Sequence, residues 1–215
     1  MSVPVCAGTV LGVIGAGRLG LAVARLALAA GMTVRVAGSG AAIRTRQVVA
    51  MFAPGAETVG AGDVMGADVV VLAMPLSAIG DIDPAILRGA IVIDAMNYWP
   101  ETDGVRPEFD DPSHPTSSMV AERFVDARVV KALNHVAFRD LEAGAKPLGS
   151  PYRIGVGLAG EGAALDAVAD VIRCLGFDAV PVGTLAESGV LEPRGPVFGA
   201  AVSAAQLRAR IDAAR

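Results

Sequence analysis

Three glycines near the amino terminus have the spacing of a phosphate-binding turn. Gly15, Gly17 and Gly20 form a G-x-G-x-x-G pattern that follows a short apolar run and opens an apolar helical pattern. In that order, the first glycine permits the tight turn, the second lets a pyrophosphate approach the backbone, and the third lets the helix pack on the strand. The free amides and positive end of the helix then face the phosphates. The expected dinucleotide contacts are Gly15, Ala16, Gly17, Arg18, Leu19 and Gly20; the alternative is a glycine turn that binds nothing.

The residues after the second expected strand indicate which dinucleotide is preferred. An NAD-binding enzyme usually carries Asp or Glu there, roughly 20 residues beyond the glycines, to bond the ribose hydroxyls. Here no acid occurs before Glu57, whereas Ser39, Arg44 and Arg46 follow the strand. A hydroxyl and guanidiniums would bind an adenosine 2′-phosphate, which a carboxylate would repel. The sequence therefore favours NADP, although either arginine could instead belong to a solvated helix face.

Further candidate residues follow the later apolar runs. The carboxyl ends of parallel strands border the cofactor crevice in this class of fold, so residues directly after such strands are candidates for contact with the nicotinamide. The residues in these positions are Ala73, Met74, Pro75, Ala95, Met96, Asn97, Asn134 and His135.

These residues require a parallel sheet to bring them together. Apolar, β-branched runs predict strands at 9–14, 33–37, near 57–59, and at 68–73, 91–94 and 128–133. Helices are expected at 18–30, ended by Gly31, and at 43–52, and residues 77–88 read as mixed helix and turn. Five or six parallel strands with crossover helices make an α/β, doubly wound sheet.

The second half of the chain departs from the strand and helix pattern of the first half at two places, residues 97–118 and the segment beyond residue 140. Residues 97–118 are rich in proline and acids, and they predict a long irregular loop that is either functional or a plain surface loop. A helix is expected after it, capped by Ser118. Beyond residue 140, strands at 154–158 and 179–182 and helices at 161–174 and 200–214 predict a small α/β lobe. We therefore expect a dinucleotide-binding domain at 1–140 and a lobe at 141–215 that closes the cofactor cleft.

Composition excludes several classes of function. The net charge of −4 and the lack of a basic block argue against nucleic acid as a partner. No charge-free apolar run reaches the roughly 18 residues of a membrane span, and Met1–Pro4 lack the start of a signal peptide, so we expect a cytoplasmic protein. Cys6 and Cys174 are expected as reduced, buried thiols. With His114 and His135 as the only histidines, no metal site is expected.

Taken together, the chain resembles the NADPH-dependent F420 reductase family, the F420H2:NADP oxidoreductases. The resemblance covers nearly the whole chain. It rests on the residue 15–20 glycine pattern and on five further motifs: Gly38-Ser39, Ala73-Met74-Pro75, Asp94-Ala95-Met96-Asn97, Val130-Lys131-Ala132-Leu133-Asn134-His135, and Leu185…Ser188…Leu191-Glu192. Related dehydrogenases with a similar amino-terminal half carry long helical carboxyl-terminal domains, for which this chain has no room.

The resemblance implies reversible hydride transfer between NADP and a deazaflavin, F420. It implies that Ser39 and Arg44 hold the 2′-phosphate, with Gly40 standing where the family has an arginine. In such a reaction Asn97 and Asn134 could bond the carboxamide or the deazaflavin edge, and His135 could bond a polar ring atom. The alternative for His135 is a histidine satisfied in the packing between the lobes. The expected small-molecule partner is thus a redox co-substrate, and the apolar carboxyl-terminal helix suggests a homodimer.

Two other functions stay open at this point. An NADP-dependent reductase of an ordinary carbonyl or imine would need a general acid, for which His135, Lys131 or Tyr98 would have to serve. A non-catalytic NADP-binding sensor would bind the cofactor without turnover, because a fold alone does not establish a reaction.

Overall fold

The computed structural model describes residues 6–214, and the expectation about Met1–Pro4 lies outside this range. The strands are β1 (Val10–Ile14), β2 (Thr33–Ala37), β3 (Glu57–Thr58), β4 (Val69–Leu72), β5 (Ile91–Asp94), β6 (Arg128–Ala132), β7 (Gly155–Ala159) and β8 (Asp178–Gly183). The α-helices are α1 (Arg18–Ala29), α2 (Ala42–Phe52), α3 (Pro100–Asp103), α4 (Thr116–Arg123), α5 (Phe138–Gly144), α6 (Gly162–Cys174) and α7 (Ala204–Asp212). The 3₁₀ helices are η1 (Ala61–Val64), η2 (Leu76–Asp81), η3 (Pro84–Leu87), η4 (Pro107–Phe109) and η5 (Leu185–Leu191).

All eight described strands belong to one sheet in the order β3-β2-β1-β4-β5-β6-β7-β8. The first six pair in parallel, in the order of the dinucleotide-binding fold, which confirms the predicted α/β doubly wound architecture. The chain leaves β1 toward β2 on one side and returns to β4 on the other, so the carboxyl ends of β1 and β4 form the switch point where such folds bind ligands.

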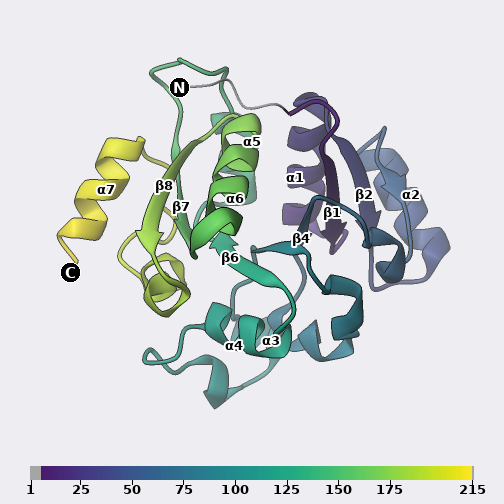
Figure 1. Ribbon diagram of the computed structural model, residues 1–215, viewed down its shortest axis with the longest axis horizontal. Coiled ribbons are helices and arrows are strands. Elements are labelled where there is room, and N and C mark those ends of the chain that lie inside the picture. Colours follow the sequence, from purple (N-terminus) through teal and green to yellow (C-terminus); the bar gives the residue numbers. More distant parts are fainter. Residues whose placement is uncertain (1–5, 215) are drawn as a thin grey trace.

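The carboxyl-terminal segment extends this sheet. β7 pairs antiparallel to β6, and β8 pairs parallel to β7. Figure 1 shows β7 and β8 on the left of the molecule and β1 and β2 on the right, with the ribbons of one sheet between them. Whether residues 141–215 act as a separate lobe over the cofactor stays a prediction.

Both faces of the sheet are covered by helices, and a separate hydrophobic core lies on each face. The central strands therefore bury apolar side chains on both sides. Helices α1, α2 and α6 pack on one face, and η1, η3 and α4 pack on the other. A third cluster holds η5 and α7 against β7 and β8. β4, whose four residues are all buried, lies between β1 and β5 and reads in the sequence as an unbroken apolar run.

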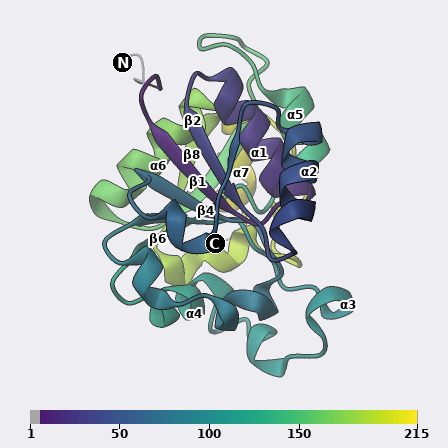
Figure 2. The same ribbon diagram turned by 90° about the vertical axis from the view of Figure 1, so that its right-hand side faces the viewer.

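The expected irregular loop is partly helical. It contains α3 and η4, and it lies with α4 beyond the carboxyl ends of the strands, where α3 stands away from the body in Figure 2. The prediction that Ser118 caps the following helix is wrong, because α4 begins at Thr116 after Pro115. The reason is tertiary: the hydroxyl of Ser117 donates to Asp94 in the core, and Thr116 binds Glu192.

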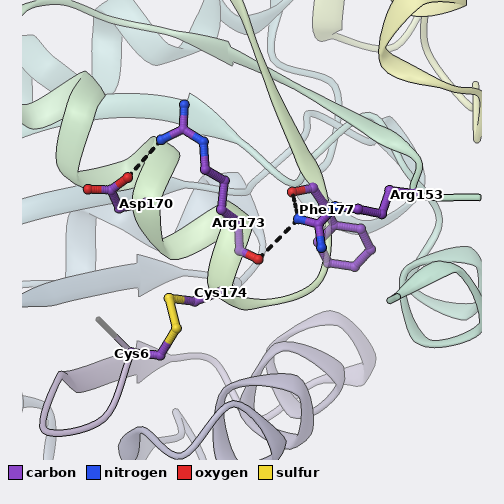
Figure 3. Close-up of a disulfide and its surroundings, with 6 residues drawn as sticks. All are labelled: Cys6, Arg153, Asp170, Arg173, Cys174 and Phe177. Atoms are coloured by element: carbon purple, nitrogen blue, oxygen red, sulfur yellow. Dashed lines mark hydrogen bonds and ion pairs between the residues drawn. A yellow bond between two sulfur atoms is a disulfide. The ribbon is translucent and has the colours of Figure 1, made fainter. Parts of the chain in front are cut away.

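Cys6 and Cys174 form a disulfide, so the expectation of two reduced thiols is wrong. Their Cα atoms lie 5.8 Å apart although 168 positions separate them in the chain. The bond ties the segment before β1 to the end of α6 (Figure 3). Close by, the buried guanidinium of Arg153 donates to the backbone carbonyls of Arg173, in the last turn of α6, and of Phe177, in the turn that follows it.

Within residues 6–214, no helix has both the length and the apolar character needed to cross a membrane.

Candidate functional site at the carboxyl edge of the sheet

Two of the three fingerprint glycines are required by packing. Gly15 follows β1 with φ +122°, and a Cβ there would lie 2.2 Å from the carbonyl oxygen of Ala73. A Cβ on Gly20 would lie 1.9 Å from the carbonyl oxygen of Gly15. The turn, α1 and the end of β4 can therefore approach one another only with glycine at both positions.

Gly17 has a different reason to be glycine. It is the N-cap of α1 with φ −84°, and a Cβ built on it meets nothing within 4 Å. No side chain caps this helix, and its first turn holds no acid. The amides of Arg18 and Leu19 thus lie in the first turn of the helix, next to open space. A diphosphate bound there could accept hydrogen bonds from these amides and would lie at the positive end of the helix dipole. Ala16 and Leu19 are half-buried beside it.

The adenosine end of the site lies after β2. A Cβ on Gly38 would lie 2.7 Å from the hydroxyl of Thr45, so the loop packs tightly on α2. Ser39 and Arg44 are exposed. Beside them is a cavity of about 790 Å³ whose wall includes the basic Arg35 and Arg46 and the acidic Glu57 and Asp63. Arg35 is paired with Glu57 at 3.5 Å, which leaves Arg46 as the cation of this wall that has no ion pair within residues 6–214. The structure thus brings Arg46 rather than Arg44 to the cavity wall, while Arg44 lies on the exposed first turn of α2.

The residues expected at the nicotinamide end lie side by side, because β4, β5 and β6 are parallel neighbours. Ala73 and Met74 are half-buried and Pro75 is exposed, whereas Ala95 and Met96 are buried beneath them. Asn97 is half-buried at the end of β5. The accessible part of this edge is therefore formed by residues 73–75 and Asn97.

Asn97 and Asn134 are bonded to each other. The Asn97 Nδ2 donates to the carbonyl of Asn134 at 2.9 Å, and the Asn134 Nδ2 donates to the Asn97 Oδ1 at 3.0 Å and to the carbonyl of Leu191 at 2.7 Å. The Asn134 Oδ1 is buried and has no hydrogen-bond partner among the described residues. An unsatisfied buried acceptor is costly, and an amide donor such as a carboxamide would satisfy this one if it reached the carboxyl end of β6.

His135 lies in the packing behind this pair. It is 1% exposed, and its Nε2 accepts a hydrogen bond from the Gly157 amide at 2.9 Å, so the Nδ1 carries the proton. Burial lowers the pKa of His135 to about 4, against the opposing effect of the nearby Val197 carbonyl. Nδ1 itself has no hydrogen-bond partner among the described residues. His135 is thus neutral near pH 7, and its catalytic role stays a prediction.

A buried ion pair joins β5 and β6 below the edge. The Lys131 ammonium lies 3.2 Å from Asp94 Oδ2 and donates to the carbonyl of Met96 at 2.7 Å. Asp94 also accepts from the hydroxyl of Ser117 at 2.5 Å. Sequence reasoning missed Asp94 and Ser117 as partners. The sequence did contain a signal for the ion pair, because each of two apolar strand runs holds a charged residue. Lys131 lies inside the run 128–133, and Asp94 ends the run 91–94.

A second cavity, of about 720 Å³, opens next to these residues, and we call it the aromatic–acidic cavity. One wall comes from residues 98–115 and the other from residues 189–198. Its aromatic lining residues are Tyr98, Trp99, Phe109 and Phe198, and its charged lining residues are Glu101, Asp110, Asp111, Glu192 and Arg194. The sequence named Tyr98 as a candidate acid and Glu192 within a motif, but only the fold brings the two segments together.

None of the three side chains considered as general acids is available in the described structure. Lys131 is fully buried in its ion pair, and His135 is buried and neutral near pH 7. The Tyr98 hydroxyl donates to the Gly104 carbonyl at 3.1 Å and accepts from the Arg106 amide at 2.7 Å. Among residues 6–214, no group of three or more His, Cys, Asp or Glu side chains is placed to hold a metal ion.

Comparisons with known proteins agree with this geometry. A family model described as NADP oxidoreductase, coenzyme F420-dependent, matches residues 10–98. Hypothetical protein SMa0349 from Sinorhizobium meliloti is 32% identical with a TM-score of 0.75, covering 89% of this chain and 93% of that one. A candidate F420-dependent NADP reductase from Arthrobacter sp. FB24 is 20% identical with a TM-score of 0.66, covering 84% and 89%.

A reductive aminase from Aspergillus terreus, solved with NADPH and ethyl levulinate, is 18% identical with a TM-score of 0.59, covering 84% of this chain and 57% of that one. At 20% identity or less, the likeness of this enzyme and of the Arthrobacter protein shows the fold alone. No curated protein sequence matches the chain.

Proposed function

Since this chain belongs to the family of F420-dependent NADP oxidoreductases, we propose that it transfers hydride between NADP(H) and a flavin-like acceptor ring. F420 is the acceptor that the family description names. NADPH supplies a hydride, which carries two electrons to the acceptor ring, while the accompanying proton comes from solvent.

The residues of this chain would hold NADP along the carboxyl edge of the sheet. The open backbone at Gly17 and the start of α1 suit the diphosphate. Ser39, Arg44 and Arg46 suit the 2′-phosphate, since no acid follows β2 before Glu57. The unpartnered Asn134 Oδ1 suits the carboxamide of the nicotinamide, and Asn97 orients the Asn134 side chain.

One observation carries the choice of reaction: the candidate acids Lys131, His135 and Tyr98 are all committed to structural hydrogen bonds or buried. Reduction of an ordinary carbonyl needs a proton donor at the forming alkoxide. A flavin-like ring accepts hydride and takes its proton on an exposed ring atom from water. Catalysis then requires only that the two rings be held at near-attack distance, roughly 3–3.5 Å, while the ring atom that takes the proton stays open to water.

The proposal is tested by mixing the protein with NADPH and oxidised F420 and following the deazaflavin absorbance. FMN, FAD and riboflavin serve as parallel acceptors, and NADH is the control donor. We expect rapid bleaching with NADPH and little with NADH. Tight NADPH binding without transfer to any of these acceptors would reject the proposal and favour the sensor role. The homodimer stays a prediction beside it.

A further inference from the structure

The aromatic–acidic cavity adjoins the proposed nicotinamide position. One of its walls begins at Tyr98, directly after Asn97, and the other includes Glu192, directly after Leu191. Asn134, at the carboxyl end of β6, donates hydrogen bonds to Asn97 and to the carbonyl of Leu191. Each of these two residues directly precedes a lining residue, one in each wall. A molecule in the cavity would therefore lie next to the residues that we assign to the nicotinamide.

The cavity has the surface that a flat ring system needs. The rings of Trp99 and Phe198 come from opposite walls and meet edge to face at 5.7 Å. Tyr98 and Phe109 form a second such pair at 5.6 Å. Trp99 is 43% exposed, so part of its apolar surface is open for contact. A volume of about 720 Å³ lies within the usual range for small-molecule sites, roughly 300–1,000 Å³.

The charge of the lining is one-sided. Arg194 is the only basic residue in it, and its guanidinium lies 2.6 Å from Asp110. This pairing leaves Glu101, Asp111 and Glu192 without a basic neighbour in the lining. The hydroxyl and then the backbone amide of Ser113 hold the pKa of Asp111 below its usual value, and nearby His114 adds to this effect.

We propose that this cavity receives the hydride acceptor, and that it selects flat rings without an anionic side chain over those that carry a phosphate or carboxylates. This proposal rests on the hydride transfer proposed above and narrows its acceptor class. The ring contacts are the same for both kinds of acceptor, whereas an anionic tail is repelled by the three carboxylates. The free deazaflavin alcohol and riboflavin are thus preferred to F420 and FMN.

Trp99 allows acceptor binding to be measured without turnover, because it is the only tryptophan of the chain. The full-length protein, with NADP⁺ present, is titrated with riboflavin and FMN, which differ by one phosphate, and then with the deazaflavin alcohol and F420. Quenching of the Trp99 fluorescence, corrected for ligand absorbance, gives each Kd. We expect the member without the anion to bind roughly tenfold more tightly at low ionic strength, and the difference to shrink in 0.5 M salt.

A charge reversal makes the test specific to the cavity. Glu101→Lys should raise the affinity for FMN relative to riboflavin several-fold. Glu108→Lys is the matched control: it makes the same change on the same segment, at an exposed residue that does not line the cavity, and it should leave the ratio unchanged.

The outcomes separate the two proposals. Equal or tighter binding of F420 and FMN, or no quenching by any ring while NADPH is still oxidised by F420, would overturn the inference and leave the proposed function standing. Selective binding of the uncharged rings without any hydride transfer would reject the proposed function and, with it, the assignment of the cavity to a hydride acceptor, and would support only the preference of the cavity for uncharged rings.

Discussion

The ammonium of Lys131 lies 3.2 Å from a carboxylate oxygen of Asp94 across two neighbouring strands, and neither side chain is exposed to solvent. The two residues are directly paired in the β5–β6 register. Buried charges of this kind need each other, because each partner offsets the desolvation of the other.

Removing one partner of this pair should therefore destabilise the protein strongly. We expect Lys131→Met to lower the free energy of unfolding by roughly 3–5 kcal/mol, because it leaves the Asp94 carboxylate buried without a counter-ion. The double variant Asp94→Leu, Lys131→Met should be less destabilised than Lys131→Met alone. Urea denaturation of the three proteins measures this. Equal stability of wild type and Lys131→Met would show that the pair is not formed.

Acidification should destabilise the native state through His135. Burial lowers the pKa of His135 to about 4 from its ordinary value of 6.5. The unfolded chain binds the proton more readily, so this contribution to stability is full above pH 6.5 and is lost as the pH falls toward 4. The expected loss from this residue is about 3 kcal/mol.

The measurement is urea unfolding at several pH values between 4 and 7. His135→Gln should flatten the dependence in this window. His114→Gln, which replaces the half-buried histidine near Glu122, is the control for the substitution itself. An unchanged slope in His135→Gln would contradict the assignment of a neutral, buried His135.

Gly17→Ala should separate binding from folding. The added methyl group meets nothing in the protein, so the cost in stability should be about 1 kcal/mol or less, as for an N-cap change. We expect NADPH affinity to fall at least about tenfold, because the methyl group occupies the position where the diphosphate approaches the backbone. NADPH fluorescence titration measures the Kd.

Two other glycine substitutions calibrate this result. Gly80→Ala, also at an open position, should leave NADPH binding unchanged. Gly20→Ala should unfold the domain instead, since its Cβ would overlap the Gly15 carbonyl. If Gly17→Ala bound NADPH normally, the diphosphate would not lie at the start of α1.

The arginines of α2 should determine the preference for NADP. Arg44→Ala and Arg46→Ala should each weaken NADPH by roughly tenfold and leave NADH almost unaffected, because only NADPH carries the 2′-phosphate. The larger effect is expected for Arg46, which lines the cavity beside Gly38. Isothermal titration with both cofactors measures this, with Arg208→Ala on α7 as the control. Equal losses for both cofactors would mean that these arginines do not read the 2′-phosphate.

The disulfide should contribute to stability. Closing a loop of 168 positions restricts the unfolded chain, and Cys6→Ser or Cys174→Ser should cost about 2–5 kcal/mol under oxidising conditions. Reduction of the wild type should have a similar effect. A thiol assay of the denatured, unreduced protein checks the bond directly: no thiol should react, whereas two reactive thiols per chain would restore the sequence-based expectation.

Local patterns in the sequence were sufficient for most of the fold. The spacing of Gly15, Gly17 and Gly20, the unbroken apolar runs and the glycine at position 31 each report backbone geometry within a few residues. They predicted the six parallel strands, the first two helices and the residues at the strand ends. They failed at Ser118, where a capping pattern was overridden by the tertiary contacts of Thr116 and Ser117 with Glu192 and Asp94.

Contacts between distant residues were decided by the tertiary structure. The disulfide, the Lys131–Asp94 pair, the antiparallel addition of β7 and the joining of residues 98–115 with 189–198 around one cavity all depend on the path of the chain. The residues adjacent to a side chain in the sequence do not indicate which distant residue it will contact in the folded chain. The sequence by itself thus determined a dinucleotide-binding sheet with its phosphate turn, and the folded chain determined what surrounds the site where the acceptor would bind.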